Sequence, residues 1–468
     1  MPMHVRRERD TLGEVAVPAD ALYGAQTARA VENFPISGWH AFPAFIRATV
    51  LVKKAAALAN LESGRLAADL CEAIVAACDE ILGGRYQDEF VVDVFQAGAG
   101  TSHNMNANEV IANRANQILG AGAPGEYAKV NPNDHVNMAQ STNDVTPTAI
   151  RLALLDLTGP VTDELDLLAA SFAGHAERYA GTVKPGRTHL QDAVPITFGQ
   201  EFGGYATRLR GAAARLRVSR AELCELGIGG TAAGTGLNAD PEYRARVCRH
   251  LAEWTGDPIV PAVDLFAAMQ STAAFVRTSS GMRTAAIELS SIANDIRLMV
   301  SGPRTGFGEL ILPVVQPGSS IMPGKINPSM AEMVDQVCYQ VIGNDTAVML
   351  GAQAGQLELN VMMPGMNFAL CFSATILANA TRVFRTKAID GLQVDEARAK
   401  EHVDSSPSLI VTALAPHIGY AKAAALVKRA LAERRPLIDV ALEEKVMPEA
   451  DLVRVLDPLP MTKGGVQS

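Results

Sequence analysis

The stretch Phe198–Leu216 has the sequence FGQEFGGYATRLRGAAARL. Its apolar residues recur at steps of four and three positions, which places them on one face of an α-helix. The residues of this stripe are Phe198, Phe202, Tyr205, Leu209, Ala212 and Leu216. The spacing therefore predicts a long helix that buries one face along its length.

A second stripe of the same kind lies further along the chain, at Met282, Ala285, Leu289, Ile292, Ile296 and Met299. Both stretches contain many small residues, which lets helices approach closely, as they do in a multi-helix bundle. Strand signals are few, and only Gly13–Val17 is expected to form part of a short hairpin. We therefore expect an all-α fold with a central bundle of long helices.

Composition restricts the class of protein. The chain has 468 residues, of which 48% are hydrophobic and 19% charged, as is typical of a soluble globular protein with two or three domains. A net charge of −9 argues against nucleic acid or an anionic membrane as a partner. No segment has the length and apolarity of a signal peptide or a membrane-spanning helix.

The cysteines show no CxxC pair and no His/Cys spacing typical of a metal site. We expect them to be reduced packing residues of a cytoplasmic protein, and we expect no metal. They are Cys71, Cys78, Cys224, Cys248, Cys338 and Cys371.

The glycine-rich stretch Gly227–Ala232 loosely resembles a dinucleotide-binding pattern. It follows a predicted helix instead of a strand, and more glycines follow it instead of a helix, so the context of a Rossmann site is missing.

Two changes in composition suggest domain boundaries. A polar run ends near residue 140, and alanine-rich sequence gives way to charged sequence near residue 395. We expect an N-terminal domain at 1–140, a central domain at 141–395 and a small C-terminal domain at 396–468.

The run Gly318–Pro328, GSSIMPGKINP, has the parts of a mobile loop that closes on an anion. Pro328 disfavours helix before it, and Ser329 with Glu332 three residues later predicts a capping box. Lys325 and Asn327 would then precede the positive end of a helix, where a carboxylate or phosphate binds favourably. Residue types alone are equally consistent with an ordinary loop that carries a solvated lysine.

Three further polar clusters precede predicted helices: GTSHNMN at 100–106, QSTND at 140–144 and GRTHLQD at 186–192. We expect the second to enter its helix through Thr146 as cap and Pro147 in the first turn. The third would lead through Pro195 into the stripe that begins at Phe198. Four such helix starts together offer many donors to one anionic ligand, although each by itself is also explained as a helix cap.

In its order of residues, the run 318–328 resembles the signature loop of the aspartase/fumarase superfamily at every position. The other three clusters resemble further signature segments of that superfamily in the same order. The similarity extends from Asp10–Glu14 and Tyr23–Thr27 to Thr412–Leu414, over most of the chain.

The resemblance implies a three-domain all-α fold whose middle domain supplies five long helices. It also implies a homotetramer in which each active site collects motifs from three chains. The implied reaction is reversible elimination from a four-carbon dicarboxylic acid, with fumarate as product and without a cofactor. A base removes a proton next to a carboxylate, and hydrogen-bond donors stabilise the resulting aci-carboxylate.

The resemblance assigns the residues of the site. Ser319 is expected to be the base, with His189 and Lys325 as further catalytic groups. The substrate is expected to be bound by Thr101, Ser141, Thr142, Asn143, Thr188, Ser320 and Asn327. Glu332 is expected to support the site by pairing with His189, or else only to complete the capping box. His103 and His135 are weaker candidates: His103 is also explained as local variation, and His135 lies in a segment that resembles a second carboxylate-binding region.

The segments nearest the predicted site resemble aspartases, because Thr142 stands where fumarases usually carry a second serine. Asp192–Pro195 also favours aspartase, whereas Gly229–Thr231 and Gly308–Leu310 favour fumarase. We therefore expect an aspartate ammonia-lyase. The alternatives are a class II fumarate hydratase, a lyase for a substituted aspartate, and a scaffold that has lost activity. The sequence departs from both patterns at Ala415–Pro416, at Gly365–Asn367 and in the tail from Met461.

Overall fold

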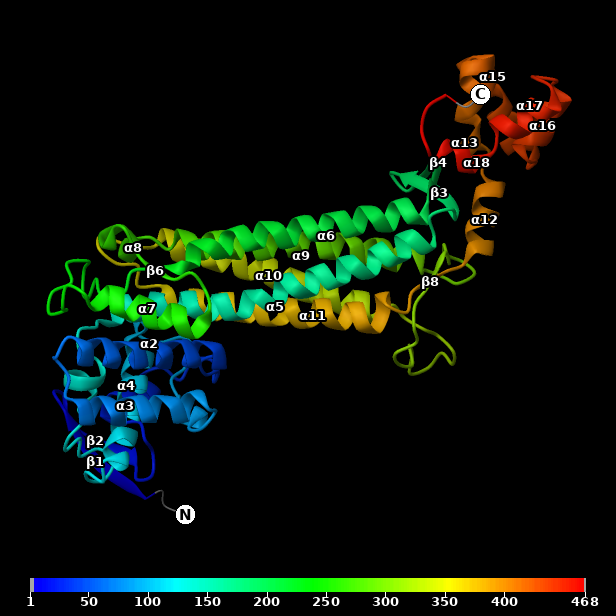
Figure 1. The fold of residues 1–468 in the computed structure, drawn as a ribbon. Helices are drawn as coiled ribbons and strands as arrows, with labels where there is room; N and C mark the ends of the chain where they lie inside the picture. Colours follow the sequence, from blue (N-terminus) through cyan, green and yellow to red (C-terminus); the bar gives the residue numbers. More distant parts are fainter. Residues whose placement is uncertain (1–3, 467–468) are drawn as a thin grey trace. The chain divides into compact units, whose positions relative to one another are not determined.

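The structure is a computed structural model that describes residues 4–466. It divides into two compact units, the first formed by residues up to 163, 214–286 and 337–378, and the second by residues 164–213, 287–336 and those from 379 onward. Within each unit, segments of the same five long helices pack side by side (Figure 1). These helices are α5 (Thr142–Arg178), α6 (Phe198–Ala221), α9 (Ala273–Met299), α10 (Ser329–Gln353) and α11 (Met363–Phe384). The all-α fold with long central helices is thus confirmed, and the domain boundaries at 140 and 395 stay predictions.

Burial follows the two predicted stripes closely. Every one of their twelve residues is at most 5% exposed. In the second unit, Phe172 of α5 packs against Phe202 and Tyr205 of α6, with ring centroids 6.0 and 5.5 Å apart. In the first unit α6 and α9 approach so closely that a Cβ on Gly281 would lie 3.0 Å from Leu216. A residue without a side chain is therefore favoured at this contact between α6 and α9.

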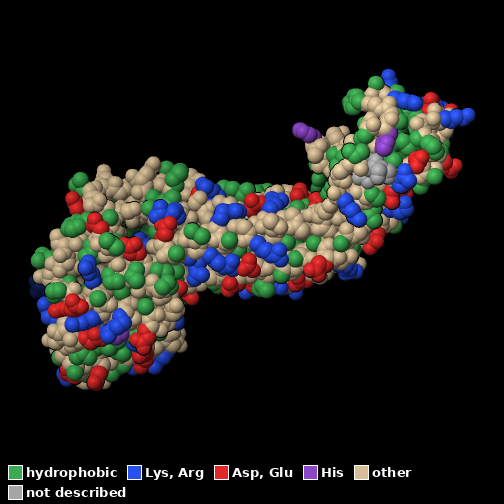
Figure 2. Space-filling model, turned by 45° about the horizontal axis from the view of Figure 1, so that its top comes forward, with side chains coloured by type: hydrophobic (Ala, Val, Ile, Leu, Met, Phe, Trp, Pro, Cys, Tyr) green, Lys and Arg blue, Asp and Glu red, His purple; other side chains and the backbone are tan. Residues whose placement is uncertain are grey.

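A few buried polar contacts join the long helices. In the first unit Arg283 of α9 donates to Asp345 of α10 at 2.7 Å. In the second unit the buried Asp335 of α10 accepts from Ser290 and Arg297 of α9 at 2.7 and 3.0 Å. On the face drawn in Figure 2, basic side chains are interspersed with acidic ones along the long helices.

The first unit also contains a smaller helical layer with its own apolar core, which includes Ile74, Cys78, Val110 and Ile111. The helices of this layer are α1 (Ala25–Asn33), α2 (Pro43–Glu62), α3 (Ala68–Leu82), α4 (Thr101–Ile118) and α7 (Tyr243–Thr255). The short helix α8 (Leu265–Gln270) follows α7 in the chain. The predicted hairpin is confirmed as β1 (Val5–Asp10) and β2 (Gly13–Pro18), which pair antiparallel. All six cysteines are buried as free thiols.

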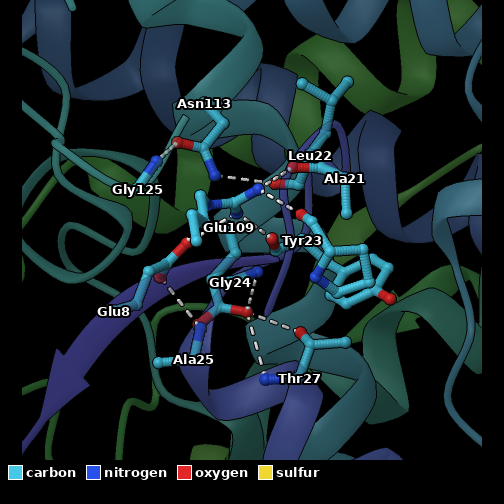
Figure 3. A network of polar contacts seen from close by, with 12 residues as sticks. Glu8, Ala21, Leu22, Tyr23, Gly24, Ala25, Thr27, Glu109, Asn113 and Gly125 are labelled. Atoms are coloured by element: carbon cyan, nitrogen blue, oxygen red, sulfur yellow. Dashed lines mark hydrogen bonds and ion pairs between the residues drawn. The ribbon is translucent and has the colours of Figure 1, made fainter. Parts of the chain in front are cut away.

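A buried carboxylate anchors the segment after this hairpin. Figure 3 shows Glu109 of α4 pointing at the start of α1, where it accepts from the backbone N–H groups of Gly24 and Thr27 and from the Thr27 hydroxyl. Arg6 of β1 donates to the carbonyls of Ala21 and Tyr23. The segment Tyr23–Thr27, which resembles a superfamily segment, thus folds around the side chain of Glu109.

The second unit contains a hairpin and a small helical region with a separate core around Leu426, Val440 and Leu452. The hairpin is formed by β3 (Val183–Thr188) and β4 (Gln191–Thr197), and β7 (Leu310–Ile311) pairs with β8 (Gln393–Val394). The helices are α12 (Glu396–Ser405), α13 (Pro407–Val411), α14 (Ala415–Ile418), α15 (Tyr420–Glu433), α16 (Leu437–Glu443), α17 (Glu449–Val455) and α18 (Pro458–Met461). None of the described helices is both long and apolar enough to cross a membrane.

His103 belongs to the core of the first unit. Its ring stacks on Phe45 with centroids 4.5 Å apart, and its Nε2 lies 3.1 Å from the Thr49 hydroxyl. Burial lowers the pKa of His103 to about 3. The structure therefore favours the alternative that this histidine packs within the protein.

We expect His103 to weaken the protein in acid. Above pH 6.5 it is neutral in both the folded and unfolded states, but below that pH the unfolded chain takes up a proton that the folded chain refuses until about pH 3. The free energy of unfolding should therefore fall between pH 6.5 and 4.5, and less so in His103→Phe. Chemical denaturation at several pH values measures this, and the exposed His40→Leu is the control that should keep the wild-type slope. Equal slopes in all three proteins would contradict the assignment.

Candidate active site

The predicted site residues are divided between the two units. The first unit carries Thr101, Ser141, Thr142 and Asn143. The second carries Thr188, His189, Ser319, Ser320, Lys325, Asn327 and Glu332.

In the first unit α5 begins earlier than predicted. Its first residue is Thr142, so the prediction that Thr146 caps it is wrong and Pro147 lies inside the helix. The Ser141 hydroxyl accepts from the N–H of Asn143 at 3.1 Å, and the Asp144 carboxylate accepts from the N–H of Ser141 at 2.9 Å. These reciprocal bonds form a capping box. The helix therefore begins at the capping box and not at Pro147, where the proline had suggested its first turn.

The starts of α4 and α5 lie against each other. The chain enters α4 through Ala99 and Gly100, both with positive φ, and a Cβ on Gly100 would lie 2.9 Å from the Thr146 hydroxyl. Asn104 of α4 donates to the Thr142 hydroxyl at 3.1 Å. Two helix N-termini, each with a threonine in its first turn, are thus brought together, and helix N-termini favour the binding of an anion.

The glycine-rich stretch is part of the same region. It follows a two-residue strand, β5 (Glu225–Leu226), which pairs parallel with β6 (Val260–Pro261), so the expectation that no strand precedes it is wrong. No helix follows it directly, because α7 begins only at Tyr243. Two of its N–H groups, those of Gly229 and Thr231, donate to the buried Asp144 carboxylate at 3.0 and 2.9 Å.

Asp144 is a residue whose role the sequence analysis missed. It is fully buried, and burial raises its pKa to about 6 although three backbone N–H groups donate to it. Beside it, Asn143 donates to the carbonyl of Ala232 at 2.8 Å. The glycine-rich stretch therefore holds the Ser141–Asn143 segment in place. The Ser-x-x-Asp pattern at 141–144 was the available signal.

His135 lies in a short π-helical turn, η3 (Pro132–Val136). Its Nδ1 accepts from the N–H of Asn131 at 2.9 Å, so this ring nitrogen is used within the turn.

In the second unit, the loop that carries Ser319 is closed at its base. The N–H of Gly318 donates to the carbonyl of Lys325 at 2.9 Å, and the Asn327 amide donates to the carbonyl of Gly318 at 2.6 Å. A Cβ on Gly318 would lie 2.3 Å from the Lys325 carbonyl oxygen, so glycine is required there. The two ends of the loop therefore meet.

Within this loop the Ser319 hydroxyl oxygen accepts two backbone hydrogen bonds, from the N–H groups of Ile321 at 3.2 Å and Met322 at 3.0 Å. Donors aimed at an oxygen favour negative charge on it. Ser320 and Lys325 are exposed, and Lys325 forms no side-chain hydrogen bond or ion pair with a described residue.

The capping box predicted at the start of α10 is wrong. Ser329 is already helical, its N–H and hydroxyl both donate to the carbonyl of Asn327, and the N–H of Glu332 donates to the carbonyl of Pro328. The backbone around Asn327 and Pro328 thus provides the acceptors at this helix start.

The chain does lead through Pro195 into α6 at Phe198, but β4 comes between, so the prediction that Thr188 and His189 lie at a helix start is wrong. Thr188 ends β3, and His189 and Leu190 form the two-residue turn of the β3–β4 hairpin with φ of 55° and 59°. Such turns usually contain asparagine and glycine. Non-glycine residues in this conformation carry strain of about 1 kcal/mol or more, which typically accompanies a functional position. Both side chains are exposed at the tip.

A buried carboxylate supports this hairpin from behind. Arg187 donates to both oxygens of Glu309 at 2.5 and 3.1 Å, and the fully buried Glu309 also contacts His402 Nδ1 at 2.8 Å. Burial opposes ionisation, but the bonds from Arg187 and His402 lower the pKa of Glu309 overall. No hydrogen bond joins His189 to Glu332 among the described residues of this one chain, so that pairing stays a prediction.

Comparisons with known proteins show which family the chain belongs to. The sequence matches the family described as Lyase over residues 13–343 and the family described as Fumarase C C-terminus over residues 410–463. The aspartate ammonia-lyase of Bacillus subtilis (strain 168) is 48% identical over 461 residues, which cover 98% of this chain and 97% of that protein. The class II fumarate hydratase of Halobacterium salinarum is also 48% identical, over 99% of this chain and 98% of that protein.

Solved structures show the same likeness. A structure described as fumarate lyase:delta crystallin from Brucella melitensis bound to cobalt has a TM-score of 0.94 and 48% identity, and covers 98% of this chain and 100% of that one. The recombinant class II fumarase of Schistosoma mansoni has a TM-score of 0.95 and 35% identity, over 98% and 99% of the two chains. The likeness in sequence and in fold extends over nearly the full length, and the chain is therefore an enzyme of the aspartase/fumarase superfamily of lyases.

Proposed function

We propose that this enzyme catalyses the reversible elimination of ammonia from L-aspartate to give fumarate. The observation that carries the proposal is the environment of Ser319, whose hydroxyl oxygen accepts two backbone N–H bonds in a loop that is closed at its base. A serine alkoxide is too basic to form in water at neutral pH, and donors of this kind lower the free energy of the anion.

In the proposed reaction, the Ser319 alkoxide takes a proton from the carbon next to one substrate carboxylate. The electron pair of that C–H bond moves into the carboxylate and makes it an aci-carboxylate, which carries an additional negative charge. When this pair forms the carbon–carbon double bond, the bond between the neighbouring carbon and nitrogen breaks, its electron pair goes to the nitrogen of the substrate's ammonium group, and neutral ammonia leaves. Lys325 and Asn327 would stabilise the charged group, and Thr188 and His189 would lie near the leaving group.

The other carboxylate would bind at the paired helix starts of the first unit. The first turns of α4 and α5 present Thr101 and Thr142, and Ser141 and Asn143 lie beside them. The helix dipole makes such positions favourable for an anion.

We also propose that the site is completed in a homotetramer, with each site shared between three chains, in the cytoplasm. Four of the proposed site residues are exposed to solvent in the single chain: Thr188, His189, Ser320 and Lys325. A single chain would therefore not shield the substrate from water during the reaction. The long helices also expose large apolar side chains, which supports association: Ile287 of α9 and Tyr339, Met349 and Leu350 of α10 are each 49–58% exposed.

The second candidate is a class II fumarate hydratase, in which water replaces ammonia. The Halobacterium enzyme is as similar to this chain as the Bacillus aspartase, so overall identity does not distinguish the two. Thr142, in the segment nearest the proposed substrate, favours aspartate. A lyase for a substituted aspartate shares the same machinery and differs only in the leaving group.

The choice of substrate can be measured directly. With purified enzyme and L-aspartate, we expect the ultraviolet absorbance of the fumarate double bond to increase, whereas L-malate should give little or no signal. An increase with malate alone would assign the enzyme to the fumarases. No signal with either would exclude both of these substrates, and assays of N-substituted aspartates would follow.

We expect Ser319→Ala to reduce kcat at least about 1,000-fold, because no other group would take the proton. The neighbouring Ser320→Ala is the matched control: it should raise KM more than it lowers kcat. Unchanged melting temperatures would show that both variants fold. A Ser319→Ala enzyme with near wild-type kcat would remove Ser319 from the mechanism.

Sharing of the site between chains can be tested by mixing two inactive variants. If Ser319 and Thr142 of one site come from different chains, tetramers reassembled from Ser319→Ala and Thr142→Ala should regain activity at roughly a quarter of their sites, by random assortment. Each variant refolded alone is the control. No recovery in tetramers that contain both variants would contradict a shared site.

A further inference from the structure

We propose that Lys53 and Asn104 are positioning residues that fix the direction of the Thr142 hydrogen bond, so that its hydroxyl can only donate to the substrate carboxylate. This inference rests on the proposed function, in which Thr142 binds a carboxylate, and it names the groups that prepare Thr142 for that role.

The arrangement begins with a lysine inside the protein. Lys53 of α2 is fully buried, and its ammonium group donates to the Asn137 side-chain oxygen at 3.0 Å and to the Gln140 side-chain oxygen at 2.9 Å. Burial lowers the pKa of Lys53 to about 7, and the nearby charge of Asp144 opposes that shift. A buried ammonium needs acceptors, and these two amides supply them.

Lys53 therefore determines which way the Asn137 amide points. In its ammonium form Lys53 cannot accept a hydrogen bond, so Asn137 presents its oxygen to the Nζ that donates to it. Its nitrogen faces the other way and donates to the backbone carbonyl of Gln140 at 3.3 Å. Both ends of this amide are fixed.

The orientation of Asn137 then fixes two asparagines of α4. Its oxygen also accepts from the amide nitrogens of Asn104 at 3.3 Å and Asn108 at 3.2 Å. As a result, the side-chain oxygens of Asn104 and Asn108 are buried without a hydrogen-bond partner among the described residues. Leaving two buried oxygens without hydrogen bonds costs free energy of folding. We infer that the two amides keep this orientation because a neighbouring group needs the amide nitrogen as a donor.

For Asn104 that requirement is Thr142. The same amide nitrogen donates to the Thr142 hydroxyl oxygen at 3.1 Å. A hydroxyl that already accepts from this side must direct its single proton elsewhere, and a carboxylate accepts hydrogen bonds only. The chain of contacts from Lys53 through Asn137 and Asn104 thus makes Thr142 a donor toward the substrate. Asn108 donates to Asn137 but forms no hydrogen bond with Thr142 among the described residues, so it serves as an internal control.

The test reverses the direction of this bond. Asn104→Asp replaces the nitrogen that donates to Thr142 with an oxygen that accepts from it, which draws the hydroxyl proton away from the substrate. Asn108→Asp places the same charge beside Asn137 without touching Thr142. Binding of succinate, a four-carbon dicarboxylate with no leaving group, would be measured by calorimetry on the assembled enzyme, together with KM and kcat for aspartate.

We expect Asn104→Asp to weaken succinate binding and raise KM by about 10-fold or more, with a smaller change in kcat, and Asn108→Asp to change them by less than about 3-fold. In a Thr142→Val background, Asn104→Asp should have little further effect, because the hydroxyl on which it acts is gone. A merely structural role for Asn104 would give the same loss in both backgrounds.

If either aspartate variant fails to fold, Lys53→Met and Lys54→Met provide a second pair on the same helix, because Lys54 bonds to Asp79 near the surface. We expect only Lys53→Met to weaken succinate binding. Equal effects within both pairs would overturn the role of Lys53 and Asn104 while leaving the proposed function intact. A wild-type enzyme that neither binds succinate nor converts aspartate or malate would instead overturn the proposed function and this inference together.

Discussion

Close packing of long helices is the constraint on which the rest of the molecule depends. Each unit is assembled from segments of the same five helices, whose apolar stripes are removed almost completely from water. Where α6 and α9 meet at Gly281, the helices approach closely and tolerate little displacement. Loops that begin at the ends of such helices start from fixed positions. Glycine-rich loops at these ends can therefore hold catalytic and binding residues.

Polar groups at the helix ends are organised by a few buried carboxylates. Asp144 holds the start of α5 and the glycine-rich stretch, Glu109 holds the segment before α1, and Glu309 holds Arg187 behind the β3–β4 turn. Each carboxylate accepts several donors, which compensates for its loss of hydration. None of the three is among the predicted site residues, although each one fixes a segment that the sequence analysis singled out.

Much of the fold could be predicted because helical periodicity is a local property. The stripes from Phe198 and Met282 determined long buried helices, and the run at Gly13–Val17 determined a hairpin. Helix starts were predicted less well. At residues 141–147 the signal of Pro147 was weaker than the capping box of Ser141 and Asp144. At 186–192 the polar cluster proved to be a hairpin turn, because His189 and Leu190 adopt a conformation that their residue types do not favour.

The helical class of the fold and the superfamily could be predicted without the structure, because apolar spacing and the order of signature residues are properties of the sequence. The sequence also contains the residue types that the chemistry needs. Only the tertiary structure decided that two backbone N–H groups donate to the Ser319 oxygen, that the starts of α4 and α5 touch, and that a buried lysine is connected through two asparagines to Thr142. The physical reason is that the direction of a hydrogen bond depends on which groups surround it in space, and those groups come from segments far apart in the sequence.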